Sequence, residues 1–147
     1  MKMTNEEYGD YVKKHAPRSP AGRNLIKAFA VGGLICCIGQ LIINCFGSLG
    51  LDTESAGTAT SITLVFLGAL LTGLGVYDNI AKFAGAGTLV PITGFANAVV
   101  APALEFKTEG LILGTATKMF TIAGPVIVYG VSSSVIVGLI FWLFGLA

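Results

Sequence analysis

Charged side chains are scarce in this sequence. Asp, Glu, Lys and Arg make up 12% of the 147 residues, whereas soluble domains carry roughly 25%. Hydrophobic residues reach 54% and lie in long blocks rather than in the short alternation of an outer-membrane barrel. These features are atypical of a soluble domain and favour an α-helical bundle over a barrel. The sequence predicts an all-α integral membrane protein, a small helical bundle.

Residues that bind metals or nucleic acids are also few. There is one histidine, and the three cysteines all fall inside the first apolar block, with no zinc-site spacing. The net charge of +1 offers no basic surface for nucleic acid. The sequence therefore predicts no resident metal, no cofactor and no nucleic-acid partner.

Catalytic groups are equally sparse. Tyr77-Asp78 resembles the Tyr-Asp pair of intramembrane aspartyl proteases, but that chemistry needs a second membrane aspartate that shares a proton with the first. The other aspartates, Asp10 and Asp52, lie in polar segments. No Ser-His pair or phosphate-binding Lys motif is present. We expect no catalytic residue and no enzyme activity.

The chain divides into a polar N-terminal segment, residues 1–24, and a transmembrane domain, residues 25–147. In the first, Thr4 and Glu7 have the spacing of a capping box before a short amphipathic helix. That helix could rest on the membrane, bind a soluble partner or form a mobile tail. No apolar core lies near the start, so we expect no cleaved signal peptide.

The transmembrane domain contains four apolar stretches, and we expect spans at about 25–46, 61–77 and 111–144, with a broken stretch at 83–104. The loop between the first two spans is acidic, whereas basic residues precede the first span. The positive-inside rule then places the N-terminus in the cytoplasm. These basic residues are Lys13, Lys14, Arg18, Arg23 and Lys27.

The stretch 83–104 has no charged residue, yet it should not form one straight helix. Glycine lowers helix propensity, and proline removes an amide donor and clashes with the preceding turn. Broken backbone at membrane depth is tolerated only inside protein or beside a wet cavity, so this stretch marks a pathway or a re-entrant loop. We expect two short helices joined near 85–91. The hinge candidates are Gly85, Gly87, Pro91, Gly94 and Pro102.

Small and polar residues recur at helical spacing in the first and last spans. They predict faces that pack against another helix, although polar ones could instead serve conduction. These packing candidates are Gly33, Gln40, Asn44, Gly130, Ser134 and Gly138. We also expect Gly124-Pro125 to interrupt the last span.

Charged residues flank the broken stretch. They could form an acidic mouth that attracts a divalent cation and then its anion, or they could be ordinary solvated helix ends. Lys118 differs because apolar residues surround it in the sequence, so we expect Glu105, Glu109 or a wet lumen beside it. The pathway candidates are Asp78, Thr93, Asn97, Glu105, Glu109 and Lys118.

Three stretches resemble the stage V sporulation protein AC family: Gly73-Leu-Gly-Val-Tyr-Asp78, Phe83-Ala-Gly-Ala-Gly87 and Val90-Pro-Ile-Thr-Gly-Phe-Ala-Asn97. The resemblance continues through Ala103-Leu-Glu-Phe-Lys-Thr-Glu-Gly110. It covers most of the chain from about residue 23 onward and is weakest in the N-terminal segment.

This resemblance implies a channel or transporter subunit in the inner membrane of the bacterial spore, the membrane of the forespore. Such a subunit moves dipicolinic acid with calcium into the forespore and releases it at germination, and the family is associated with tension-gated opening. The implied partners are other stage V sporulation protein A subunits, including a related small membrane subunit and a soluble dipicolinate-binding subunit, in a homo- or hetero-oligomer. Calcium dipicolinate is here the transported solute.

Two functions remain open from the sequence alone. The chain could form the pore, or it could be a non-conducting membrane scaffold that assembles another subunit's pore. The resemblance brings no established set of pore residues, so the candidates named above rest on their chemistry.

Overall fold

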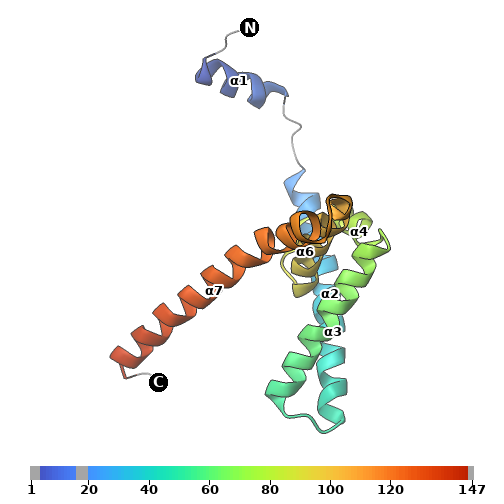
Figure 1. The fold of residues 1–147 in the computed structure, drawn as a ribbon, viewed down its shortest axis with the longest axis vertical. Coiled ribbons are helices and arrows are strands. Elements are labelled where there is room, and N and C mark those ends of the chain that lie inside the picture. The colour runs from blue at the N-terminus through green and yellow to red at the C-terminus, as the bar shows by residue number, and fades with distance from the viewer. Residues whose placement is uncertain (1–3, 16–19, 146–147) are drawn as a thin grey trace.

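The computed structural model describes residues 4–15 and 20–145, and within these ranges the chain contains helices and turns but no strand (Figure 1). These described ranges leave out parts of both predicted segments, 1–24 and 25–147. The expected all-α membrane architecture is confirmed, with three helical stretches long and apolar enough to cross a membrane. The elements are α1 (Asn5–His15), α2 (Ala21–Ser48), α3 (Thr53–Gly73), α4 (Tyr77–Ala84), α5 (Ala86–Leu89), α6 (Ile92–Glu105), a 3-10 turn η1 (Lys107–Glu109), a π-helical turn η2 (Leu111–Ala116) and α7 (Thr117–Leu143).

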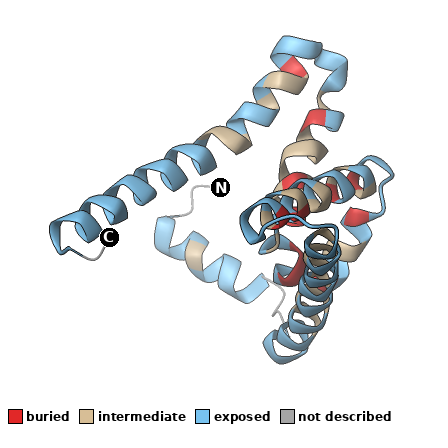
Figure 2. Cartoon of the chain, turned by 90° about the horizontal axis from the view of Figure 1, so that it is seen from below, coloured by how far each residue is buried: buried red, intermediate tan, exposed pale blue. Residues whose placement is uncertain are grey.

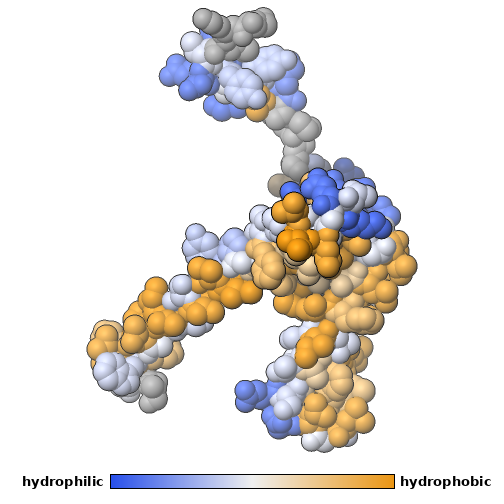
Figure 3. Space-filling view, viewed as in Figure 1, coloured by the Kyte–Doolittle hydropathy of each residue, from blue (hydrophilic) through white to orange (hydrophobic). Residues whose placement is uncertain are grey.

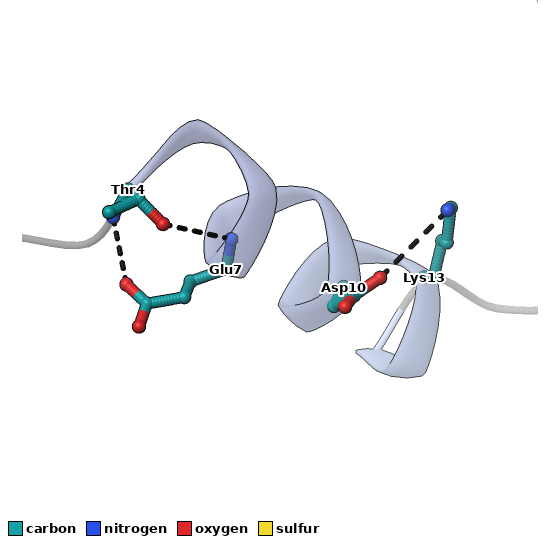
Figure 4. A network of polar contacts seen from close by, with 4 residues as sticks. All are labelled: Thr4, Glu7, Asp10 and Lys13. Carbon is teal, nitrogen blue, oxygen red and sulfur yellow. Dashed lines mark hydrogen bonds and ion pairs between the residues drawn. The ribbon is translucent and has the colours of Figure 1, made fainter.

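Helix α1 begins at the predicted capping box. The backbone N–H of Thr4 donates to the Glu7 carboxylate at 2.9 Å, and the N–H of Glu7 donates to Thr4 Oγ1 at 3.3 Å (Figure 4). These bonds satisfy two amide donors that a helix start leaves without partners. One helical turn on, Lys13 lies 3.9 Å from Asp10, an exposed ion pair of little energetic weight.

Helices α2 and α3 form a hairpin (Figure 1). Asp52 caps the start of α3, where its carboxylate accepts from the N–H groups of Glu54 and Ser55, both at 3.2 Å. The hydrogen bonds from Ser55 hold the pKa of Asp52 below its ordinary value. Helix α3 therefore begins earlier than the predicted span 61–77, because the cap fixes its start.

The broken stretch folds as a re-entrant hairpin. Gly87 of α5 lies against Ala28 and Gly32 of α2, so α4 and α5 run alongside the first part of α2. On the returning limb, Gly68 of α3 faces Thr93 of α6, and Thr72 of α3 bonds to Asn97 of α6. The second contact lies four residues further along both helices, so α6 runs parallel to α3. Both ends of the stretch consequently lie at the end of the bundle where α2 begins and α3 ends (Figure 1).

The breaks occur at Gly85 and at Pro91. Gly85 has φ +55°, which L side chains rarely adopt, and Pro91 is extended with φ −64° and ψ 158°. The expected interruption between 85 and 91 is thus confirmed. Pro102 differs, because α6 continues through it to Glu105.

Pro125 likewise lies inside α7, where an interruption was expected. A proline removes only one helical hydrogen bond, and helices at membrane depth tolerate it because local adjustments and neighbouring groups restore the freed backbone contacts. Helix α6, which contains Pro102, packs against α3, η2 and α7. Neither proline ends its helix.

The buried core is built from small residues. Apart from Tyr77, every buried residue among those described is Ala, Gly or Thr. Red segments in Figure 2 gather where α3, α5 and α6 meet, whereas the outer part of α7 is exposed throughout. Small side chains let backbones approach closely, which is how helices associate where lipid is as apolar as leucine.

The surface is banded. In Figure 3, hydrophilic side chains gather at both ends of the α2–α3 hairpin, and hydrophobic side chains cover the region between. Helix α7 leaves the bundle (Figure 1). On its predicted packing face, a Cβ added at Gly130 or Gly138 would meet nothing within 4 Å, and Ser134 between them is exposed. In the part of the chain that the structure describes, this face of α7 is not covered.

We predict that Gly87→Ala destabilises the protein. An added Cβ would collide with the Ala28 backbone, and overpacking typically costs about 1–3 kcal/mol. Gly33→Ala is the matched control, because Gly33 lies mid-helix in open space and alanine favours helix there by about 1 kcal/mol. Thermal unfolding in detergent measures both, and equal unfolding temperatures for the two variants would contradict the close contact.

We also predict that α1 loses helix in acid. The backbone and side-chain hydrogen bonds with Thr4 lower the pKa of Glu7 from its ordinary value of 4.5. Ionised Glu7 therefore favours the helix above that value, and the stabilisation disappears as the pH falls through the lowered pKa. Cα chemical shifts of α1, followed from neutral pH to about pH 2.5, report this change. Glu7→Gln should remove most of it, and Glu6→Gln, outside the capping box, should leave it; the reverse pattern would exclude the assignment.

Candidate functional site

A buried polar cluster joins the re-entrant hairpin to α3. Its centre is Tyr77, at the start of α4, which is 3% exposed. The Tyr77 hydroxyl donates to the carbonyl oxygen of Thr88 at 3.0 Å and shares a second hydrogen bond with Thr93 Oγ1 at 2.8 Å. One side chain thus connects α4, α5 and α6, the three short helices of the hairpin.

Thr88 satisfies the backbone at the first break. It is fully buried, and its Oγ1 donates to the carbonyl oxygen of Gly85 at 2.9 Å. The Thr88 carbonyl, near the second break, accepts from Tyr77. Both carbonyls have therefore found partners inside the protein, which a bilayer could not supply.

Thr72 and Asn97 extend the cluster to α3. Thr72 Oγ1 lies 2.8 Å from Asn97 Oδ1 and 2.7 Å from the carbonyl oxygen of Gly68, one turn back in its own helix. We call Thr72, Tyr77, Thr88, Thr93 and Asn97 the polar cluster. Among the described residues, no buried side-chain nitrogen or oxygen lacks a hydrogen-bond partner. The buried side chains of the polar cluster are thus all hydrogen-bonded.

The structure divides the predicted pathway residues into two groups. Thr93 and Asn97 belong to the polar cluster. Asp78, Glu105 and Glu109 are exposed and lie at the two ends of the hairpin, outside the cluster. Because both ends lie on one side of the bundle, the three carboxylates share that side without sharing one cavity.

Lys118 does not have the expected carboxylate partner. Its ammonium lies 3.8 Å from the centroid of the Phe106 ring, and in the part of the chain that the structure describes no ion pair joins it to Glu105 or Glu109. The turns η1 and η2 fold the chain back after α6, so that the carboxylates point to solvent and the ring meets the lysine. A cation over an aromatic face gains about 0.5–2 kcal/mol.

The hinge glycines serve as contact points as well as breaks. A Cβ at Gly94 would collide with the carbonyl oxygen of Thr88, so α6 could not begin where it does with any larger residue. Gly87 plays the same part against α2. Of the five hinge candidates, Gly85 ends α4, Pro91 directly precedes α6, Gly87 and Gly94 permit close approach, and Pro102 lies within α6.

The packing candidates on α2 are not used as expected within this chain. Gln40 donates to Asn44 at 2.9 Å on the same helix, so the two side chains satisfy each other. Both line a cavity of about 510 Å³ that reaches the start of α3. Gly33 has no neighbour within 4 Å, and the adjacent Gly32 makes the contact with the hairpin.

Sequence reasoning missed the centre of the cluster. It treated Tyr77 only as half of a protease-like dipeptide, and it did not single out Thr88. A tyrosine in an apolar stretch needs a partner for its hydroxyl when it is buried, and this requirement was the available signal. The described residues contain no group of three His, Cys, Asp or Glu side chains that could hold a metal ion.

We predict that Tyr77→Phe destabilises the hairpin. The change removes one oxygen and leaves the Thr88 carbonyl and the Thr93 hydroxyl short of a buried partner, at a cost of about 1–3 kcal/mol. Tyr129→Phe is the matched control, because Tyr129 is exposed on α7. Thermal unfolding in detergent should separate the two, and a Tyr77 variant as stable as the Tyr129 variant would show that the cluster contributes little.

Comparison with known proteins places the chain in a family. The model of the SpoVAC/SpoVAEB sporulation membrane protein family matches residues 24–140. The chain is 52% identical over 141 residues to stage V sporulation protein AC of Bacillus subtilis (strain 168), which covers 94% of each protein. No solved structure matches it significantly. The chain belongs to the SpoVAC/SpoVAEB family of sporulation membrane proteins.

Proposed function

We propose that this chain is a subunit of a channel or transporter in the spore inner membrane. It moves dipicolinic acid with calcium into the forespore during sporulation and out again at germination, with its N-terminus in the cytoplasm. Membership of a family of sporulation membrane proteins supports the setting. The identity of the solute rests on the family resemblance described above.

One observation carries the transport role: an apolar stretch folds into a re-entrant hairpin whose polar groups meet in a buried cluster. A scaffold helix has no need of such a stretch, because a straight helix satisfies its own backbone. Transporters place broken helices where a substrate passes. Thr93 and Asn97 stand on the returning limb, and parting them from Tyr77 and Thr72 would expose hydroxyl and amide groups to a solute.

The charged ends of the hairpin suit an ion pair as solute. Asp78, Glu105 and Glu109 can attract calcium, and Lys118 stands nearby on the first turn of α7. Calcium prefers carboxylate oxygens, whereas dipicolinate carries carboxylates that a lysine can balance. Rings of such side chains select ions in channels.

A single chain supplies only part of such a path. Helix α7 has no buried residue, so its apolar surface faces lipid or other subunits. We infer that further copies, a related small membrane subunit and a soluble dipicolinate-binding subunit complete the assembly. The same exposed helix favours the second candidate, a membrane scaffold that holds another subunit's pore.

Purified protein in liposomes loaded with calcium dipicolinate separates the two candidates. A pore-forming subunit should release the solute faster than protein-free liposomes do, as read by lanthanide luminescence of dipicolinate outside. Lys118→Met should slow this release, because it keeps the stem and removes the charge, and Lys107→Met, an exposed lysine in η1, is the control. Protein-free rates for the wild type would favour the scaffold, and equal rates for the two variants would remove Lys118 from the path.

A further inference from the structure

A second cavity lies away from the polar cluster, between the start of α2 and the first break of the hairpin. Its volume is about 330 Å³. One wall comes from the first two turns of α2, and the other from the end of α4 and the start of α5. The lining residues are Ala21, Asn24, Leu25, Ala28, Lys82, Phe83, Ala84, Gly85 and Ala86.

Positive charge surrounds this cavity. Lys82 lines it, and the Lys27 ammonium lies 4.3 Å from the centroid of the Phe83 ring, which forms part of its wall. Arg23 precedes Asn24 on the first turn of α2. No acidic residue lines the cavity, and in the described ranges no ion pair joins Lys82 to Asp78, one turn earlier on α4. The local charge is therefore that of a cationic pocket.

The first turn of α2 adds to this charge. It contains no acidic residue, and no side chain caps it. The start of a helix carries a partial positive charge. This contribution is secondary to the lysines, but it has the same sign.

Exposed apolar side chains lie beside the charged ones on α2. Leu25, Ile26 and Phe29 follow along α2, and each is at least 70% exposed. Leu25 also belongs to the cavity wall. A molecule held here would meet both cations and exposed hydrocarbon, on a helix that is apolar enough to cross a membrane.

We propose that this cavity binds the headgroup of an anionic phospholipid, with the phosphate between Lys82 and Lys27 and one acyl chain along Leu25 and Phe29. Cationic pockets between helices at the membrane surface bind such headgroups. A soluble anion would use only the cations and would leave the apolar surface unused. The combination of both surfaces is what selects a lipid.

Such a lipid would touch both α2 and the first break of the hairpin. The cavity spans α2 and the Gly85 break, and Ala28, which lines it, also makes the close contact with Gly87. The bound headgroup therefore fastens the descending limb of the hairpin to the first long helix. Lipid composition would then influence how firmly the hairpin is held.

The test is native mass spectrometry of the full-length protein in detergent, titrated with phosphatidylglycerol or with phosphatidylcholine of the same acyl chains. We expect preferential binding of phosphatidylglycerol. Lys82→Gln should weaken it about fivefold and the double change with Lys27→Gln further, because each cation near an anionic headgroup contributes about that factor. Lys82→Arg should retain it. Lys107→Gln, an exposed lysine outside the cavity, is the matched control.

Three results would overturn the proposal: equal affinity for the two lipids, a loss in Lys107→Gln as large as that in Lys82→Gln, or displacement of the lipid by inorganic phosphate. The last would identify a site for soluble anions. Thermal unfolding of each variant in detergent shows whether a loss reflects unfolding, and Lys82→Arg provides a folded variant with the charge intact. The experiment involves no solute transport, so its outcome is independent of the channel assignment.

Discussion

A helix that breaks at membrane depth frees backbone groups, and hydrocarbon offers them no hydrogen bonds. The fold of this chain follows from that constraint. The Thr88 hydroxyl meets the Gly85 carbonyl at the first break, and Tyr77 meets the Thr88 carbonyl near the second. Because a tyrosine reaches far enough to serve two short helices at once, a single ring holds the hairpin together. The small residues around it then allow α3 and α6 to lie close enough for Thr72 and Asn97 to bond.

The small size of the core residues explains why the chain buries so few large apolar side chains. Alanine, glycine and threonine bring backbones together, but they leave leucine, isoleucine and phenylalanine on the outside. In water such a surface would aggregate, whereas in a bilayer it is the ordinary exterior. The protein is thus organised from the inside by close backbone contacts and from the outside by lipid. Its charged residues are left for the two ends of the bundle (Figure 3).

Sequence reasoning reached the helical membrane class, the capping box and the two breaks, because hydropathy, Thr4 and Glu7, and Gly85 and Pro91 each act over a few neighbouring residues. It could not pair Tyr77 with Thr93 or place Lys118 over Phe106, because such contacts depend on how the chain turns between distant segments. It also expected breaks at Pro102 and Pro125. Pro102 and Pro125 show that a proline ends a helix only where its surroundings fail to compensate. The roles of the charged candidates in conduction remain predictions.

The turn η2 has a consequence for the last helix. In this turn the N–H of Thr115 donates to the carbonyl oxygen of Gly110, five residues back, and Thr117 Oγ1 donates to Ile112 in the same spacing. A π turn holds more residues than an α turn. Each α-helical residue advances about 100° around the axis. A one-residue change in the hydrogen-bond register of η2 would therefore rotate the whole of α7 about its axis by roughly that angle. The stripe Gly130, Ser134 and Gly138 would then face a different direction. The hydrogen-bond register of the six-residue turn η2 therefore determines which neighbour this stripe of α7 can contact.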